Sequence, residues 1–317
     1  MKKSITPGAT PAAYDSQALY DKAERYIQNM YNHDSDEWEY ALWSSLALEF
    51  LARAALANVS PTLLAETNQN WSHLYYSLGF APVEERYSPK SIAISEVLRR
   101  LQNILPDFNK EHLTFGEGHT GRRNSELHSG ELGFDGVKAS SWQPRFYQTC
   151  EVLLKSMGFT MEDLLGTEEA DVARKLITAA ADDSAKAVKG EIERHRAAWA
   201  DKVPAEILIL KAQATIWANR QSGHRVVCPA CNSASLVTGE PASVPSQKLQ
   251  NDEIIETQEY LPTHFECVAC GLKISGLSKL AVAGLSDRYK KTQVYDPAEY
   301  YAPEDDWHGY EEDNNEP

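Results

Sequence analysis

The segment TGRRNSELHSG, residues 120–130, combines side chains that are suited to act on a phosphate group. The imidazole of His128 can take and give protons near neutral pH, and the guanidinium of Arg123 presents a fixed fork of donors to phosphate oxygens. On a helix, Asn124 and His128 share a face because they lie four residues apart. With His128 as general acid/base and Arg123 stabilising the phosphate, such a site could cleave RNA through its 2′-OH without a metal. The alternative is an exposed surface segment between glycines.

Two further charges lie on an earlier stretch that is apolar almost all round. Residues 38–57 are predicted to form a long central helix, with Ser35 or Asp36 as its N-cap. Glu49 and Arg53 lie four residues apart within it. Charges in such a helix must be paired or belong to a functional site. The spacing leaves both interpretations open, a part of the catalytic site or a buried structural salt bridge.

Four of the five cysteines form two pairs at the same spacing, Cys228-Pro-Ala-Cys231 and Cys267-Val-Ala-Cys270. Two such knuckles place four thiolates in a tetrahedron around one ion, which is the four-cysteine site that structural zinc prefers. Gly271 follows the second knuckle, where a tight turn needs a positive φ. A closed site with four thiolate ligands leaves no position for water, so we expect a structural zinc and no catalytic metal. The alternative, two disulfides, is disfavoured in a reducing cytoplasm.

Hydrophobic periodicity predicts a mainly α chain that ends in a small β-rich region. Helices are expected over residues 14–31, 38–57, 88–105, 140–159 and 168–200, the last being the longest. Cys150 is expected to be a small buried apolar residue. The glycines of residues 116–121 match a dinucleotide-binding fingerprint, but this match is rejected because helices flank it on both sides. These glycines are instead expected to shape the loop that leads into the segment from Arg123 to His128. From about residue 222, β-branched residues, Pro and Gly predict short strands and turns.

The chain has 317 residues and a formal net charge of −15. Such acidity argues against non-specific binding of nucleic acid, which depends on Lys and Arg that neutralise phosphates. Seven acidic residues lie within 304–316, and the charge without them is still −8, so any nucleic-acid site must be local. The chain has no apolar run of membrane-spanning length and no secretory signal, which predicts a cytoplasmic protein without a membrane partner. Residues 301–317 are expected to be a disordered acidic tail.

The N-terminal half resembles a HEPN domain, a helical superfamily that includes many RNases of toxin and antiphage systems. The resemblance rests on the run from Arg123 to His128, with four intervening residues and Asn124 after the arginine, and on Glu49 and Arg53 of an earlier helix. It covers residues 14–158. The resemblance implies metal-independent RNA cleavage that leaves a cyclic phosphate, at a site formed across a homodimer with both copies of the motif in one cleft.

These observations predict four regions: a HEPN-like helical bundle over 14–158, a helical linker or extension over 159–221, a zinc-ribbon domain over 222–300, and the tail over 301–317. We expect a metal-independent endoribonuclease of an antiphage defence or toxin system. Its catalytic residues would be Arg123, Asn124, His128, Glu49 and Arg53. Its partners would be RNA, a second copy of the chain, and a defence-system or antitoxin protein. The alternative is a non-catalytic dimeric adaptor or regulator whose zinc ribbon binds nucleic acid or protein.

Overall fold

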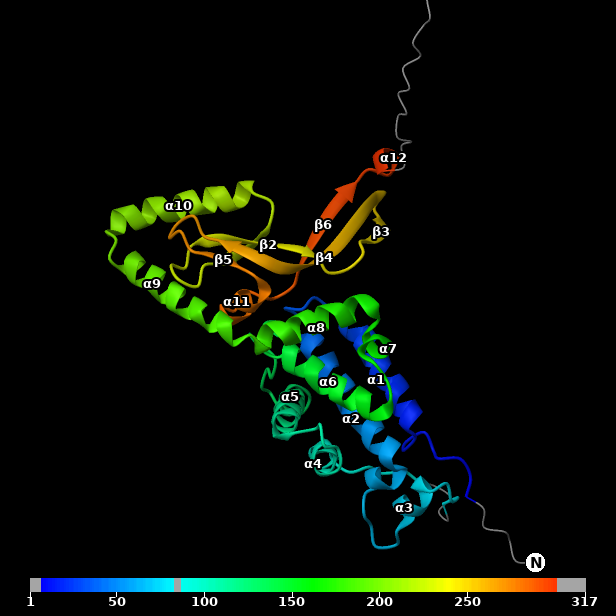
Figure 1. Cartoon of the computed structure of the whole chain (residues 1–317). Helices are drawn as coiled ribbons and strands as arrows, with labels where there is room; N and C mark the ends of the chain where they lie inside the picture. The colour runs from blue at the N-terminus through cyan, green and yellow to red at the C-terminus, as the bar shows by residue number, and fades with distance from the viewer. Residues whose placement is uncertain (1–6, 83–86, 301–317) are drawn as a thin grey trace, which may run out of the picture.

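The computed structural model describes residues 7–82 and 87–300, so the predicted tail at 301–317 lies outside the described residues. The α-helices are α1 (Ser16–Met30), α2 (Trp38–Val59), α3 (Ser72–Ser77), α4 (Ile94–Ile104), α5 (Lys110–His128), α6 (Gln143–Met157), α7 (Met161–Leu165), α8 (Thr167–Ala181), α9 (Val188–Ala200), α10 (Pro204–Arg220), α11 (Leu277–Val282) and α12 (Pro297–Tyr300). Short 3₁₀ helices are η1 (Pro61–Leu64), η2 (Ala139–Ser141) and η3 (Asp183–Ala187). The strands are β1 (His224–Val227), β2 (Ala234–Pro241), β3 (Ser246–Gln250), β4 (Glu253–Glu266), β5 (Lys273–Ser275) and β6 (Tyr289–Tyr295). A mainly helical N-terminal part is thus followed by an antiparallel sheet, which confirms the predicted fold class (Figure 1).

The helical body is built around α2, as predicted for a helix that is apolar on nearly all sides. Helices α1, α4, α5 and α6 all lie against it. Leu48, Leu51 and Leu56 of α2 are almost completely buried, and each contributes about 1.5–3 kcal/mol relative to an exposed side chain. Within the described residues, no helix is both long enough and apolar enough to cross a membrane.

The predicted N-cap of α2 is wrong. The cap position is Glu37, which makes no side-chain hydrogen bond to the first turn. The hydroxyl of Ser35 instead donates to the backbone oxygen of Arg288 at 3.3 Å. A side chain that sequence spacing assigns to a helix end is therefore used to join the helical body to the sheet.

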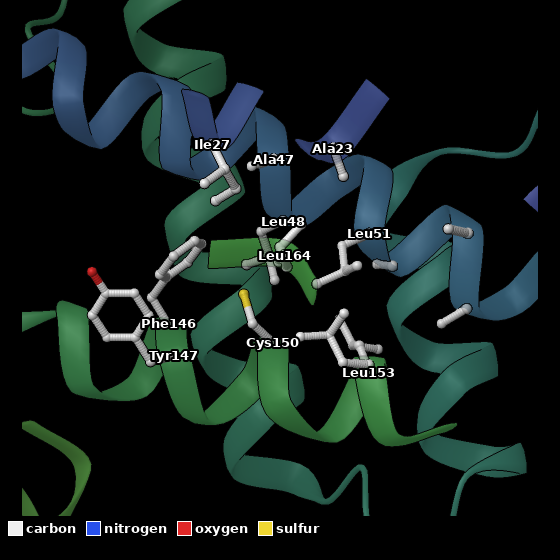
Figure 2. Packing of buried hydrophobic residues seen from close by; sticks show 14 of the residues in the cluster. Ala23, Ile27, Ala47, Leu48, Leu51, Phe146, Tyr147, Cys150, Leu153 and Leu164 are labelled. Carbon is white, nitrogen blue, oxygen red and sulfur yellow. The ribbon is translucent and has the colours of Figure 1, made fainter. Parts of the chain in front are cut away.

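Cys150 of α6 lies in the middle of the helical core. Figure 2 shows its sulfur between Leu48 and Leu51 of α2 on one side and Leu153 of its own helix on the other. Cys150 is 1% exposed, and burial raises the pKa of its thiol well above the ordinary value. A thiol that stays protonated in apolar surroundings is a poor nucleophile, which agrees with the predicted packing role.

The predicted long helix over residues 168–200 is wrong, because the structure divides it into α8, η3 and α9. The backbone at Asp182 is extended, with φ −77° and ψ 95°, and Asp and Ser in this segment favour local side-chain hydrogen bonds over a continuous helix. The apolar stripe divides at the same place. Leu176 belongs to the helical core, whereas Val188 and Ile192 belong to the core beneath the sheet.

Strand β4 is the centre of the sheet. Its first half pairs with β3 and β6, and its second half pairs with β2 and β5, all antiparallel. Strand β1 extends the sheet beyond β2. The β2–β4 register shifts between Thr238 and Gly239, and a Cβ at Gly239 would stand 2.2 Å from the backbone oxygen of Leu261. Glycine is therefore required where β2 bends. Figure 1 shows α9 and α10 as a V beside this sheet, away from most of the bundle.

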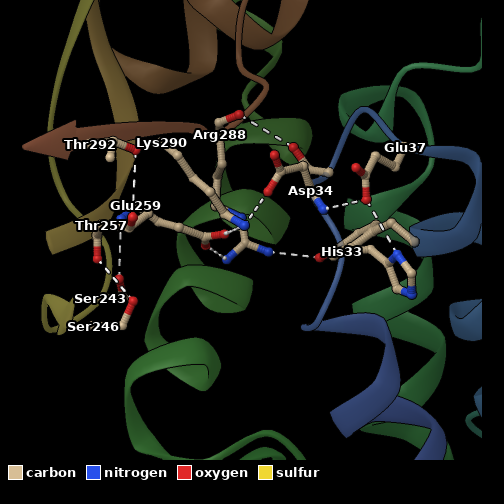
Figure 3. Close-up of polar contacts among 12 residues, drawn as sticks. His33, Asp34, Glu37, Ser243, Ser246, Thr257, Glu259, Arg288, Lys290 and Thr292 are labelled. Carbon is tan, nitrogen blue, oxygen red and sulfur yellow. Dashed lines mark hydrogen bonds and ion pairs between the residues drawn. The ribbon is translucent and has the colours of Figure 1, made fainter. Parts of the chain in front are cut away.

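A buried ionic cluster joins the sheet to the helical body. Arg288, next to the first residue of β6, has a side chain that is 3% exposed. Its guanidinium contacts the carboxylates of Glu169 in α8 and Glu259 in β4, and it donates to the Tyr40 hydroxyl of α2 at 2.8 Å. Lys290 pairs with Asp34 nearby, as Figure 3 shows. Charges this deeply buried require partners, so the cluster fixes how the two parts meet.

Candidate functional site

The segment with the predicted catalytic residues is helical throughout. Helix α5 runs through Gly116 and Gly121 to His128, so the loop expected from the glycines of 116–121 is wrong. Asn109 caps the helix by accepting from the backbone N–H of Glu111 at 2.8 Å. Gly116 lies where α5 meets α4, and a Cβ there would stand 3.0 Å from a methyl group of Leu98. Close approach to a neighbouring helix, and not a turn, therefore explains this glycine.

Glu49 lies between two arginines. Arg53, one turn further along α2, donates to Oε1 of Glu49 from Nε at 3.0 Å and from Nη2 at 2.7 Å. Arg123 of α5 places Nη2 2.7 Å from Oε2 of Glu49. All three side chains are only 11–12% exposed. Arg53 also donates to Ser91 and to the backbone of Ile92, each at 3.0 Å, so its role here is to hold α2 against the segment before α4.

The Glu49–Arg53–Arg123 triad carries one carboxylate against two guanidinium groups, which leaves a net charge of +1. Nε of Arg123 is buried and has no hydrogen-bond partner among the described residues. A buried donor without a partner costs about 1–3 kcal/mol. The triad is therefore the structural salt bridge that the sequence allowed, with one guanidinium charge in excess; Oε2 of Glu49 likewise has no hydrogen-bond partner among the described residues.

His128 and Asn124 lie at the exposed end of α5. Within the described part of the chain, neither side chain takes part in a hydrogen bond or an ion pair. Arg123 and His128 are five residues apart, so they project about 140° from one another around the helix axis. One copy of the chain therefore does not aim both groups at the same point, and a second copy would have to complete such a site.

The four paired cysteines converge beneath the sheet. Their sulfur atoms all lie within 4.8 Å of one another, and three of the four residues are buried. Sγ of Cys228 is 3.6 Å from that of Cys270, and Sγ of Cys231 is 3.6 Å from that of Cys267. A tetrahedron with Zn–S bonds of about 2.3 Å has edges of about 3.8 Å. The spacing therefore fits one zinc ion and is far too long for the disulfide alternative.

Both knuckles use the same backbone turn. The N–H of Asn232 donates to the carbonyl of Cys228 at 3.0 Å, and the N–H of Gly271 donates to the carbonyl of Cys267 at 2.8 Å. Asn232 and Gly271 have φ values of 54° and 77°. The predicted positive φ at Gly271 is confirmed. Asn232 takes the equivalent conformation, which asparagine tolerates better than most residues.

The thiols of the cluster shift one another's pKa values. The pKa of the Cys231 thiol is lowered to about 6, chiefly because the thiol of Cys228 donates to its sulfur. The same neighbours raise the pKa of Cys270, with Cys228 again the largest cause. Zinc binds thiolates, so its binding would require these thiols to lose their protons. This donor set would supply a folding constraint and leaves no open coordination position for catalysis.

No protein-family model, curated protein or solved structure matched this chain.

Two histidines without a distinctive sequence pattern around them have defined contacts. Nδ1 of His195 in α9 lies 2.8 Å from the backbone oxygen of Cys270, so α9 buttresses the second knuckle. Nε2 of His119 in α5 lies 2.8 Å from the hydroxyl of Ser44. His119 is buried, and burial lowers its pKa to about 3, with a smaller contribution from Arg122. Both contacts join residues 75 positions apart, and no local sequence pattern signals them.

Proposed function

We propose that the chain is a metal-independent endoribonuclease of the HEPN type that acts as a homodimer. The observation that supports this most is the triad of Glu49, Arg53 and Arg123. It carries a net charge of +1 and a buried donor without a partner among the described residues, and its Arg123 precedes the exposed His128 on α5. Asn124, exposed on the same turn as Arg123, would add a hydrogen bond to the substrate.

In this proposal His128 takes the proton of a ribose 2′-OH while the 2′ oxygen attacks the adjacent phosphorus. The bond from phosphorus to the 5′ oxygen breaks, and His128 of the second copy gives a proton to the leaving 5′ oxygen. The products are a 2′,3′-cyclic phosphate and a 5′-OH. Arg123 would stabilise the charge that builds on the phosphate oxygens, and Glu49 would orient Arg123. General acid–base help of this kind is worth about 10²–10⁴ in rate.

The test is cleavage of mixed RNA by the full chain during a brief exposure to EDTA. Wild type is compared with His128→Ala and Arg123→Ala, and with two matched controls. His33→Ala removes another partly exposed histidine, and Arg194→Ala removes an exposed arginine of α9. We expect both α5 variants to lose at least about 10²-fold in rate and both controls to keep it. Equal cleavage by all five proteins would falsify the assignment.

A second candidate, a non-catalytic adaptor, is favoured by one observation on α10. Leu208, Ile209 and Ile216 on this helix are 70%, 58% and 53% exposed. An apolar helix face of this kind marks a protein contact more often than a bare surface. The same assay separates the candidates, because an adaptor would leave RNA intact in wild type and in every variant.

A further inference from the structure

A groove of about 800 Å³ runs between α5 and α6 on the surface of the helical body. Arg122, which lines it, directly precedes Arg123 of the triad on α5. Its floor includes Trp142 and His119, whose rings lie 4.9 Å apart. The two helices run in opposite directions along it, since His119 contacts Trp142 at one end and His112 contacts Thr149 at the other.

Three cations line this groove at intervals. Lys110 begins α5, and Arg122 lies twelve residues later, about 18 Å along the helix axis. Arg145 of α6 comes between them, because the His119–Trp142 and His112–Thr149 contacts bracket its position. Within the described residues, none of these three side chains takes part in an ion pair or a side-chain hydrogen bond. A single small anion cannot bridge such a distance, whereas the repeated phosphates of a chain can.

The groove is positive in an otherwise acidic protein. Glu111 is the one carboxylate among the described residues that line it, which leaves a net charge of +2, whereas the whole chain carries −15. His112 adds no charge. The Thr149 hydroxyl donates to the Arg145 carbonyl at 2.7 Å, so the proton of His112 lies on Nδ1 and points at Thr149. Burial lowers the pKa of His112, with Glu111 opposing weakly, so the ring is neutral at pH 7.

We propose that the α5–α6 groove binds the phosphate backbone of single-stranded RNA, with Lys110, Arg145 and Arg122 contacting successive stretches of the strand. This inference rests on the proposed function, because that function supplies RNA as the polyanion and places cleavage at the neighbouring end of α5. A single strand fits because its backbone can follow a narrow channel between two helices, and backbone contacts of this kind need no base sequence.

The test uses a fluorescein-labelled oligouridine in which every 2′-OH is methylated. Cleavage through the 2′-OH cannot occur on this probe, so its fluorescence anisotropy reports binding alone. Arg122→Gln combined with Arg145→Gln is compared with Arg194→Gln combined with Arg220→Gln, which removes two exposed arginines from α9 and α10. Each phosphate contact with a single strand contributes about 0.7 to the slope of log affinity against log salt.

We expect the groove variant to lower that slope by about 1.4 and to weaken binding about 25-fold near 0.1 M salt, while the control pair binds as wild type does. Glu111→Gln should tighten binding. The proposal is overturned if the wild type does not bind the probe. It is also overturned if the groove variant and the control variant lose the same amount of affinity for the probe. Normal probe binding by a His128→Ala protein that no longer cleaves RNA would support the groove. If the groove variant loses probe binding and the wild type does not cleave RNA, the proposed nuclease function is rejected and the proposed RNA binding by the groove is supported.

Discussion

The helical body and the cysteine-bearing sheet are stabilised in different ways. The body encloses a large apolar core shared by several of its helices, with Leu48 and Leu98 fully buried. The core beneath the sheet is smaller, and Cys228, Cys231 and Cys267 are themselves part of it. In the helical body, burial of apolar surface supplies the main driving force for folding. In the second region, three of the four cysteines that could hold a metal are part of the interior, so the two regions should respond differently to the same perturbation.

The largest expected effect is loss of the metal that the four cysteines could hold. Cys267→Ser removes one ligand, and zinc sites of this kind supply about 10 kcal/mol or more of folding free energy. We expect the sheet to become open to protease while the helical body stays resistant. Limited proteolysis followed by mass spectrometry of the fragments measures this, and metal analysis should find one zinc per wild-type chain and none in the variant.

Cys150→Ser is the matched control, because it changes a buried cysteine outside the cluster. It should leave zinc content and the resistance of the sheet unchanged, and any loss should fall on the helical body. If Cys267→Ser left the sheet as resistant as in wild type, the zinc would be dispensable and the contrast between the regions would fail.

The second effect concerns the ionic cluster that joins the regions. Arg288→Ala removes the paired cation of Glu169, leaves Glu259 with only Lys290 at 4.0 Å, and removes a donor from Tyr40. Removing one partner of a buried ion pair lowers the free energy of unfolding by about 3–5 kcal/mol. Urea unfolding of the full chain should show this loss, and the single transition of wild type should separate into two as the regions come apart.

Arg174→Ala provides the comparison for that experiment. Arg174 pairs with Glu162 at the surface of α8, where its side chain is 44% exposed, and such pairs contribute about 0–1 kcal/mol. A loss for Arg288→Ala no larger than that for Arg174→Ala would mean that the cluster does not hold the regions together.

The sequence predicted the parts of this structure whose causes are local. The convergence of the two Cys-x-x-Cys pairs and the burial of α2 are both confirmed. Both were predictable because each pattern lies within one short stretch of sequence. The glycines of α5 were misread because their reason lies elsewhere. A side chain at position 116 would press against Leu98 of α4, so glycine is favoured there. A single sequence does not show which helices pack against each other.

The candidate catalytic site was predictable only in part for the same reason. Four-residue spacing allowed Glu49 and Arg53 to pair, as one of the two interpretations left open, and they do. The contact of Glu49 with Arg123 joins residues from two helices, and no local pattern signals it. Whether His128 reaches a common cleft depends on a second copy of the chain, and that stays a prediction.

The smallest of the three effects is a pH response confined to the helical body. His119 is neutral in the fold, with its pKa lowered to about 3 by burial, whereas an unfolded histidine titrates near 6.5. The unfolded chain therefore binds more protons below about pH 6.5. The contribution of His119 is fully present above that pH and is lost as the pH falls toward 3. Between pH 7 and pH 5 this amounts to about 2 kcal/mol of unfolding free energy.

His119→Gln keeps a donor near Ser44 and removes the titration. Urea unfolding of the helical transition, with zinc in excess, should show that wild type loses about 2 kcal/mol more than this variant between pH 7 and pH 5. His33→Gln changes a partly exposed histidine and should follow wild type. If wild type and His119→Gln instead lost stability in parallel, the acid sensitivity of the chain would come from elsewhere. The four clustered cysteines would then be the next candidates, because thiols must be deprotonated to hold a metal ion, and the sheet would be the acid-sensitive region.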